Sequence, residues 1–132
     1  MTISTHVVLG GNGITGRETI RALLRRGETV TSVGRRPSTL EGALSETADL
    51  TNAVDAARVL AGKTVAYFTI GLPYSTRVWA AQWLVILRNV IDAAIQHGTR
   101  LVYLDNVYAY GAVDAPMTEQ TPLHPTSRKG RI

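Results

Sequence analysis

Four glycines near the N-terminus carry the strongest chemical signal in the sequence. The segment from Val7 to Arg17 reads VVLGGNGITGR, in which Gly11, Gly13 and Gly16 fit the pattern G-x-G-x-x-G. Gly10 adds an overlapping G-x-x-G-x-x-G register. A glycine turn from a strand into a helix lets backbone N–H groups approach a diphosphate above the positive end of the helix. A purely structural turn is the alternative, but an apolar strand before and a helical pattern after the glycines favour a dinucleotide site.

Two adjacent arginines form the second informative feature. Arg35 and Arg36 follow the second predicted strand, where NAD-binding folds usually carry an Asp or Glu for the ribose 2′-hydroxyl. Here no carboxylate occurs until Glu41. Guanidinium groups suit a 2′-phosphate, so the pair favours NADP over NAD. An ordinary basic turn is the alternative.

Two further positions lie at the ends of predicted strands. Asp49 lies near the end of the third strand, where it either caps the next helix or contacts the adenine, and it could do both. Gly71 follows the fourth strand, and ligands of open α/β sheets bind at the carboxyl ends of the strands.

Alternating strands and helices must position these residues. The apolar patterning predicts strands at 5–9, 28–33, 44–50, 65–70 and 100–104, and helices at 14–26, 52–60 and 79–96. This order predicts an α/β Rossmann fold: a doubly wound parallel sheet with strand order 3-2-1-4-5 and right-handed crossovers.

The length of 132 residues predicts a single domain over 1–132, in which 112–132 is a loop-rich tail. The chain ends as if another helix were about to begin, so we expect a C-terminal substrate-binding part to be missing. No signal peptide and no membrane span are expected, and the absence of cysteine fits a cytoplasmic protein. The three histidines are too dispersed to predict a metal site.

The formal charge of +4 raises the question of nucleic-acid binding. No recognition helix and no aromatic–basic motif accompanies the arginines, and a solvated helix face plus a phosphate pocket explains them. Nucleic acid is therefore not an expected partner.

The predicted helix at 78–97 is apolar nearly all round. One face should pack on the sheet and the other needs a partner, so we expect a homodimer through this helix. Trp79 and Trp83 are interpreted as core or interface residues, with a ligand-binding pair as the less favoured alternative.

Three segments resemble the extended or atypical short-chain dehydrogenase/reductases, the superfamily that includes the NAD-dependent epimerase/dehydratases. These segments are Gly10–Gly16, the run ADLT at 48–51 and the run LVYLDNVYAYG at 101–111. The segment at 117–122, which reads MTEQTP, is also similar to the loop that follows the Tyr-Gly pair of that superfamily. The resemblance covers the whole chain but only the N-terminal half or so of a usual member. Together with the residues above, it implies that the cofactor contacts Gly10, Asn12, Gly13, Ile14, Thr15, Gly16, Arg35, Arg36, Asp49, Leu50 and Gly71.

The sequence departs from that superfamily at the catalytic positions. A Ser or Thr that polarises the substrate is replaced by Asn106, whose amide can donate a hydrogen bond but cannot relay a proton. The acid/base pair Tyr-x-x-x-Lys is absent, which leaves Lys129 without a tyrosine partner. Tyr108 and Tyr110 are alternative proton donors, although packing near the cofactor is the favoured interpretation.

The resemblance implies an NADP-binding oxidoreductase or epimerase that acts on a small carbonyl or hydroxyl compound or on a sugar nucleotide. Hydride transfer is expected at a substrate carbon over Gly71 and Asn106. The alternative is a non-catalytic NADP-binding or redox-sensing protein, which the missing Ser, Tyr and Lys favour. A third interpretation is that the chain is a truncated piece with an incomplete active site.

Overall fold

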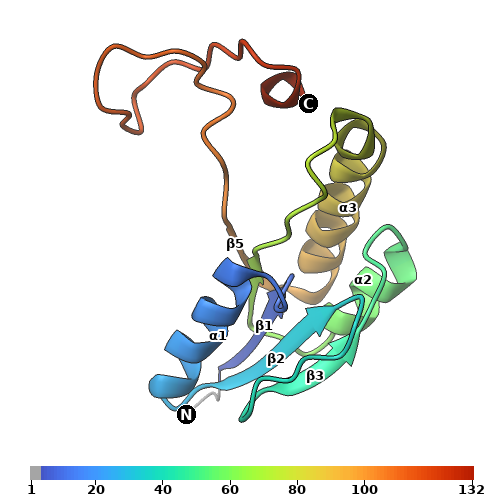
Figure 1. The fold of residues 1–132 in the computed structure, drawn as a ribbon. Coiled ribbons are helices and arrows are strands. Elements are labelled where there is room, and N and C mark those ends of the chain that lie inside the picture. The colour runs from blue at the N-terminus through green and yellow to red at the C-terminus, as the bar shows by residue number, and fades with distance from the viewer. Residues whose placement is uncertain (1–3) are drawn as a thin grey trace. The chain divides into compact units, whose positions relative to one another are not determined.

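The computed structural model describes residues 4–132, which form five strands, three α-helices and a short 3-10 helix (Figure 1). In chain order these are β1 Thr5–Leu9, α1 Ile14–Arg25, β2 Thr29–Gly34, β3 Leu44–Thr47, α2 Ala53–Leu60, β4 Val65–Phe68, α3 Thr76–His97, β5 Arg100–Tyr103 and η1 Lys129–Arg131.

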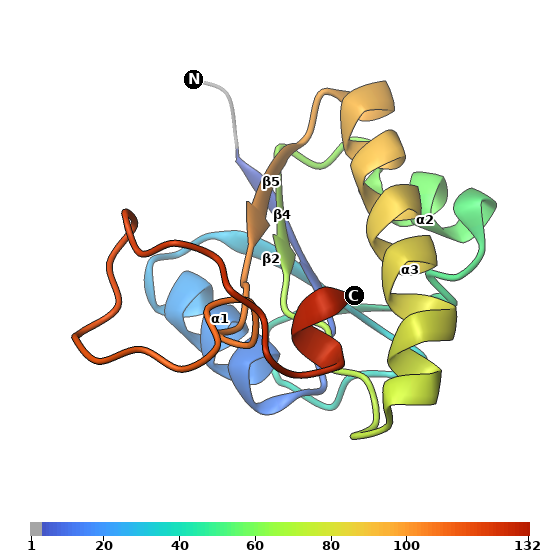
Figure 2. The same ribbon diagram turned by 90° about the horizontal axis from the view of Figure 1, so that it is seen from above.

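All five strands are parallel and lie in the order β3-β2-β1-β4-β5, so the predicted Rossmann topology is confirmed. In Figure 2, α1 lies on one side of the sheet, and α2 and the C-terminal part of α3 lie on the other. The central strand β1 is therefore covered on both faces. Its residues Val7, Val8 and Leu9 are completely buried, which explains why this part of the strand is entirely apolar.

Two element boundaries differ from the sequence prediction by three residues, and the others differ by at most two. The strand β3 ends at Thr47 and not at residue 50, because Asp49 and Thr51 form a hydrogen-bonded turn. The helix α3 begins at Thr76, directly after Ser75, whose side-chain oxygen accepts from the Val78 N–H at 3.4 Å. The sequence prediction missed Ser75 as a helix-starting residue.

The helix α3 combines a buried stripe with an exposed apolar stripe. Its buried residues recur every three or four positions from Trp79 through Trp83, Ile86 and Val90 to Ala93, and Ala94 adjoins the last of them. By length and composition alone α3 is the one helix among the described residues that could cross a membrane, and a core helix of a soluble protein passes the same test. The buried stripe is the pattern of such a core helix.

The described residues divide into two compact units. The first extends to Gly71 and resumes at 85–104, and it contains the sheet, α1, α2 and the C-terminal part of α3. The second comprises 72–84 and 105–132, which are the first turns of α3 and the loop-rich tail.

The second unit is held together by close backbone and ring contacts. The rings of Trp79 and Trp83 stack with centroids 4.3 Å apart. Gly111 has a φ of +69° and faces the carbonyl oxygen of His124, so a side chain at this position would collide with the backbone. The tail is therefore a folded part of this unit despite its lack of regular structure.

Candidate functional site

The turn between β1 and α1 is pinned at its first two residues. The N–H groups of Gly10 and Gly11 both donate to the Val33 carbonyl oxygen, at 2.9 and 3.0 Å. Gly10 has a φ of +87°, and a Cβ there would lie 2.9 Å from Ile70 Cα and from the Thr69 carbonyl oxygen. The turn can therefore pass close to the end of β4 only because this residue is glycine.

The N-terminus of α1 presents free backbone donors. Its N-cap is Gly13, which has no side chain to accept from the first N–H groups of the helix. The first backbone bond of the helix runs from the Arg17 N–H to the Gly13 carbonyl at 2.9 Å, so the N–H groups before Arg17 have no intrahelical partner. Ile14 is 87% exposed at this end. An anion placed here would accept from these donors and meet the positive end of the helix dipole.

Gly16 lets α1 pack against the turn. A Cβ at this position would collide with the Gly10 carbonyl oxygen and lie 2.9 Å from Gly11 Cα. The predicted role of the last glycine, close approach of the helix, is therefore visible in the structure. Thr15, beside it, is exposed.

Asn12 connects the glycine turn to the arginine loop. Its Nδ2 donates to the Arg36 carbonyl oxygen at 2.8 Å, and a Cβ on Gly34 would lie 3.0 Å from the same nitrogen. The sequence analysis predicted that Asn12 contacts the cofactor. It did not predict this hydrogen bond, which links residues 24 positions apart. Asn12 thus positions the backbone of the loop that carries both guanidinium groups.

Arg35 and Arg36 are both exposed. Neither guanidinium lies within 4.0 Å of a carboxylate among the described residues. Arg35 is nevertheless close enough to Asp49 for its charge to help lower the pKa of that carboxyl group. Both arginines are therefore available to a phosphate in solution.

Asp49 closes a turn after β3. Its Oδ1 accepts from the Thr51 hydroxyl at 2.7 Å and from the Thr51 N–H at 3.0 Å. These two hydrogen bonds, with the charge of Arg35, hold the pKa of Asp49 below its usual value. The N-cap of α2 is Asn52, whose side chain accepts from the Val54 N–H at 2.9 Å, so the interpretation of Asp49 as that cap is wrong.

Two other predicted cofactor contacts lie after strands of the first unit. Leu50 is buried, and its carbonyl oxygen accepts from Asn89 Nδ2 at 3.0 Å. Gly71 is exposed, and an added Cβ would meet nothing within 4 Å. Contact of either residue with a cofactor stays a prediction.

Asn106 belongs to the second unit and is half-buried. Its Oδ1 accepts from the Tyr108 N–H at 3.0 Å, so the side-chain oxygen is used within its own turn. Its Nδ2 has no hydrogen-bond partner in residues 4–132 and is the atom that can donate to a carbonyl oxygen.

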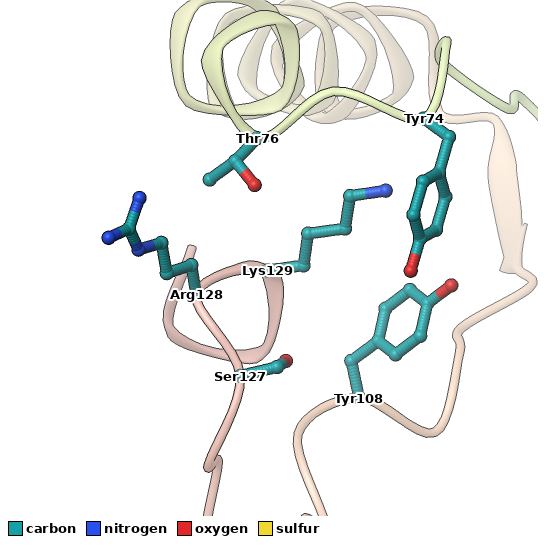
Figure 3. A pocket seen from close by; sticks show the side chains of 6 residues that line it. All are labelled: Tyr74, Thr76, Tyr108, Ser127, Arg128 and Lys129. Carbon is teal, nitrogen blue, oxygen red and sulfur yellow. The ribbon is translucent and has the colours of Figure 1, made fainter.

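Lys129, which the sequence left without a tyrosine partner, lies among aromatic rings of the second unit (Figure 3). Its Nζ is 3.2 Å from the centroid of the Tyr74 ring, 5.2 Å from that of Trp79 and 5.9 Å from that of Tyr108. Sequence reasoning missed this cluster, because Tyr74 and Lys129 are far apart in the chain and no periodicity connects them.

A family model described as the NAD dependent epimerase/dehydratase family matches residues 6–128. No curated protein matches the chain. Among solved structures, a UDP-galactose 4-epimerase is similar with a TM-score of 0.85 at 25% identity, over 96% of this chain and 47% of its own. MoeE5 in complex with UDP-glucuronic acid and NAD gives 0.77 at 26% identity, over 97% and 45%.

A short-chain dehydrogenase/reductase superfamily protein from Agrobacterium tumefaciens with bound NAD gives a TM-score of 0.82 at 24% identity, over 96% of this chain and 41% of its own. The chain therefore spans less than half the length of these three proteins.

Proposed function

The chain belongs to the NAD-dependent epimerase/dehydratase family, and from this premise we propose that it binds NADP in preference to NAD. We further propose that it serves as an oxidoreductase or epimerase, acting in the cytoplasm on a small carbonyl or hydroxyl compound or on a sugar nucleotide. The family and fold support a nicotinamide dinucleotide in general. The preference for NADP rests on this chain's own residues.

The observation that carries the proposal is the pair of free guanidinium groups next to the glycine turn. Asn12 bridges the turn to the Arg36 backbone, so the uncapped N-terminus of α1 and the two arginines belong to one connected piece of structure. A diphosphate on the turn and a phosphate on the ribose 2′-oxygen fit this arrangement of donors. NAD has no 2′-phosphate and would leave both arginines without that partner.

In this mechanism the chain's residues bind the dinucleotide and orient the substrate. The N–H groups at the start of α1 hold the pyrophosphate, Arg35 and Arg36 hold the 2′-phosphate, and Asn12 fixes the loop between them. The bound dinucleotide supplies hydride transfer at its nicotinamide ring. The Asn106 amide donates to the substrate's carbonyl oxygen, a role in which it orients the substrate without moving a proton.

The class of substrate is supported by two similar structures. One is a UDP-galactose 4-epimerase and another contains UDP-glucuronic acid together with NAD. Both are about one quarter identical to this chain and roughly twice as long, so the sugar nucleotide comes to this protein as part of the proposal.

A non-catalytic NADP-binding or redox-sensing protein is the second candidate. The Asn106 side-chain oxygen is used by the Tyr108 N–H, and no Tyr-x-x-x-Lys occurs in the sequence. Cofactor binding without NADPH oxidation across a broad panel of carbonyl compounds and sugar nucleotides would favour this candidate over the enzyme.

The central test is a calorimetric comparison of NADP and NAD. We expect the unmodified chain to bind NADP at least about tenfold more tightly, since hydrogen bonds to a charged phosphate contribute on the order of 1.5–3 kcal/mol. The double variant Arg35→Ala/Arg36→Ala should lose this preference while its affinity for NAD stays the same. Arg25→Ala/Arg26→Ala removes an equally exposed pair at the end of α1 and should keep the preference. Equal affinities of the unmodified chain for the two cofactors would refute the proposal.

A further inference from the structure

The second unit contains a cavity of about 290 Å³ (Figure 3). Its volume is at the small end of the range of ligand pockets, which is roughly 300–1,000 Å³. Six residues line it, namely Tyr74, Thr76, Tyr108, Ser127, Arg128 and Lys129.

The lining carries positive charge and no negative charge. Arg128 and Lys129 are its two ionised side chains, and no Asp or Glu is among the six. Within residues 4–132, neither cation lies within 4.0 Å of a carboxylate. Thr76 is the first residue of α3, so the positive end of that helix dipole adds to the same field. The cavity is therefore suited to an anion.

Lys129 is held in place by ring faces and not by a counter-ion. Its ammonium group lies 3.2 Å from the centroid of the Tyr74 ring, with the rings of Trp79 and Tyr108 farther away. A cation above an aromatic face is attracted to it, but the face provides no lone pair for the remaining N–H groups. Lys129 is half-buried, so donors that point into the cavity gain by meeting an acceptor.

The backbone around Lys129 is also fixed. Ser127 Oγ accepts from the Gly130 N–H at 3.0 Å, and Gly130 packs against the Tyr108 carbonyl oxygen so closely that a side chain could not fit. The turn that presents the lysine is therefore held by contacts on both sides of Lys129. Preorganised donors of this kind cost little to bring to a ligand.

The other lining groups are hydroxyls. Thr76 and the phenols of Tyr74 and Tyr108 can each donate and accept one or more hydrogen bonds. They suit a small ligand that has several hydroxyl or carbonyl groups besides its anionic group.

We propose that this cavity binds a small hydroxylated compound through a carboxylate or phosphate group, with Lys129 as the principal anion-binding residue and Arg128 as the second. The assignment of this compound as the substrate rests on the proposed function, whereas binding of the anion does not. Carboxylate and phosphate share the chemistry that Lys129 recognises, and the experiment below distinguishes them.

Three sugars of one ring size provide the probes. Glucuronate carries a carboxylate, glucose 6-phosphate carries a phosphate, and glucose is neutral. Calorimetric titration of the full chain should show at least about tenfold tighter binding of one or both anions than of glucose. Raising the salt concentration should weaken the binding of the anions, and the tighter anion identifies the acidic group.

The variants separate charge from structure. Lys129→Met keeps the aliphatic stem and should weaken binding of the preferred anion by about tenfold or more. Lys129→Arg keeps the charge and should bind within a few-fold of the unmodified chain, which shows that the site tolerates substitution. Arg128→Gln should weaken the same anion by a smaller factor. Arg131→Gln removes a neighbouring charge outside the cavity and should have no effect.

Equal binding of the three sugars, or equal losses in Lys129→Met and Arg131→Gln, would overturn the proposal. NADP affinity measured on the same samples keeps the two proposals apart. A chain that binds NADP but neither anion refutes only this inference. A chain that binds an anion through Lys129 but no dinucleotide refutes only the proposed function.

Discussion

Because Gly16 has no Cβ, α1 can pack closely against the turn that precedes it. A Cβ would collide with the Gly10 carbonyl oxygen, which belongs to a backbone already fixed by the Val33 carbonyl and cannot move aside cheaply. The donors at the start of α1 and the helix packing therefore depend on the same glycine.

We predict that Gly16→Ala lowers the free energy of unfolding by about 1–3 kcal/mol and reduces dinucleotide affinity at least about tenfold, because the helix end must move. Urea denaturation and calorimetry measure the two effects. Gly71→Ala is the matched control for stability, since its added methyl group meets nothing within 4 Å. A Gly16→Ala chain of unchanged stability and affinity would contradict this account.

Asp49 gives the fold a small dependence on pH. Hydrogen bonds from Thr51 lower the pKa of this carboxyl group in the folded state below its ordinary value of 3.8. A lowered folded pKa means that the stabilisation is complete above the unfolded pKa and is lost as the pH falls through the folded pKa. Since Asp49 is exposed, solvent screening keeps the effect small.

We expect Asp49→Asn to be less stable than the unmodified chain at neutral pH, and the difference to disappear as the pH falls through the lowered pKa of Asp49. Urea midpoints over this pH range measure it. Thr51→Val removes the hydroxyl that donates to Asp49 and should make the stability of the fold less dependent on pH, as Asp49→Asn does. A constant difference between the Asp49→Asn variant and the unmodified chain at all pH values would show that the ionised carboxylate contributes nothing.

At the scale of elements, the sequence predicts the strands and helices well because their apolar patterns are local. The central strand β1 ends in the apolar run VVL, and the alternation of strands and helices along the chain predicts a doubly wound parallel sheet. The ends of elements are harder to predict, because several polar residues compete as caps. Asp49 and Asn52 both precede α2, and only the structure shows that Asn52 is the cap.

The candidate site likewise has features that the local sequence predicts and features that it does not predict. The glycine turn is a local motif, so its residues could be found from spacing alone. The bridge from Asn12 to Arg36 and the aromatic rings around Lys129 are contacts between distant parts of the chain. Nothing in the local sequence encodes them, and they emerge only when the sheet and the tail are folded.

The assignment of Asn52 as the cap of α2 can be tested directly. Asn52→Ala should lower the free energy of unfolding by about 1 kcal/mol, because the Val54 N–H loses its acceptor. Asn52→Asp retains an acceptor and should be nearly neutral. The change in urea midpoint measures both. If the two variants lose the same stability, the side-chain hydrogen bond is not the reason.

At the scale of the whole molecule, α3 has more apolar surface than its buried stripe requires. Val85, Ile91 and Ile95 are exposed on the helix, and Ile95 is 75% exposed. Scattered single apolar residues are common on protein surfaces, but a run along one helix more often marks a protein interface. We therefore propose that a second copy of the chain covers this side of α3.

Sedimentation at micromolar concentration tests this homodimer. We expect the unmodified chain to sediment as a dimer and Ile91→Glu/Ile95→Glu to sediment as a monomer. The free energy of burying two unpaired carboxylates exceeds the stabilisation that the apolar contact provides. Gln96→Glu adds a charge at an exposed neighbouring position and should leave the dimer intact. A monodisperse monomer of the unmodified chain would contradict the proposal. Dissociation by Gln96→Glu as well would mean that net charge, and not the apolar side of α3, controls the association.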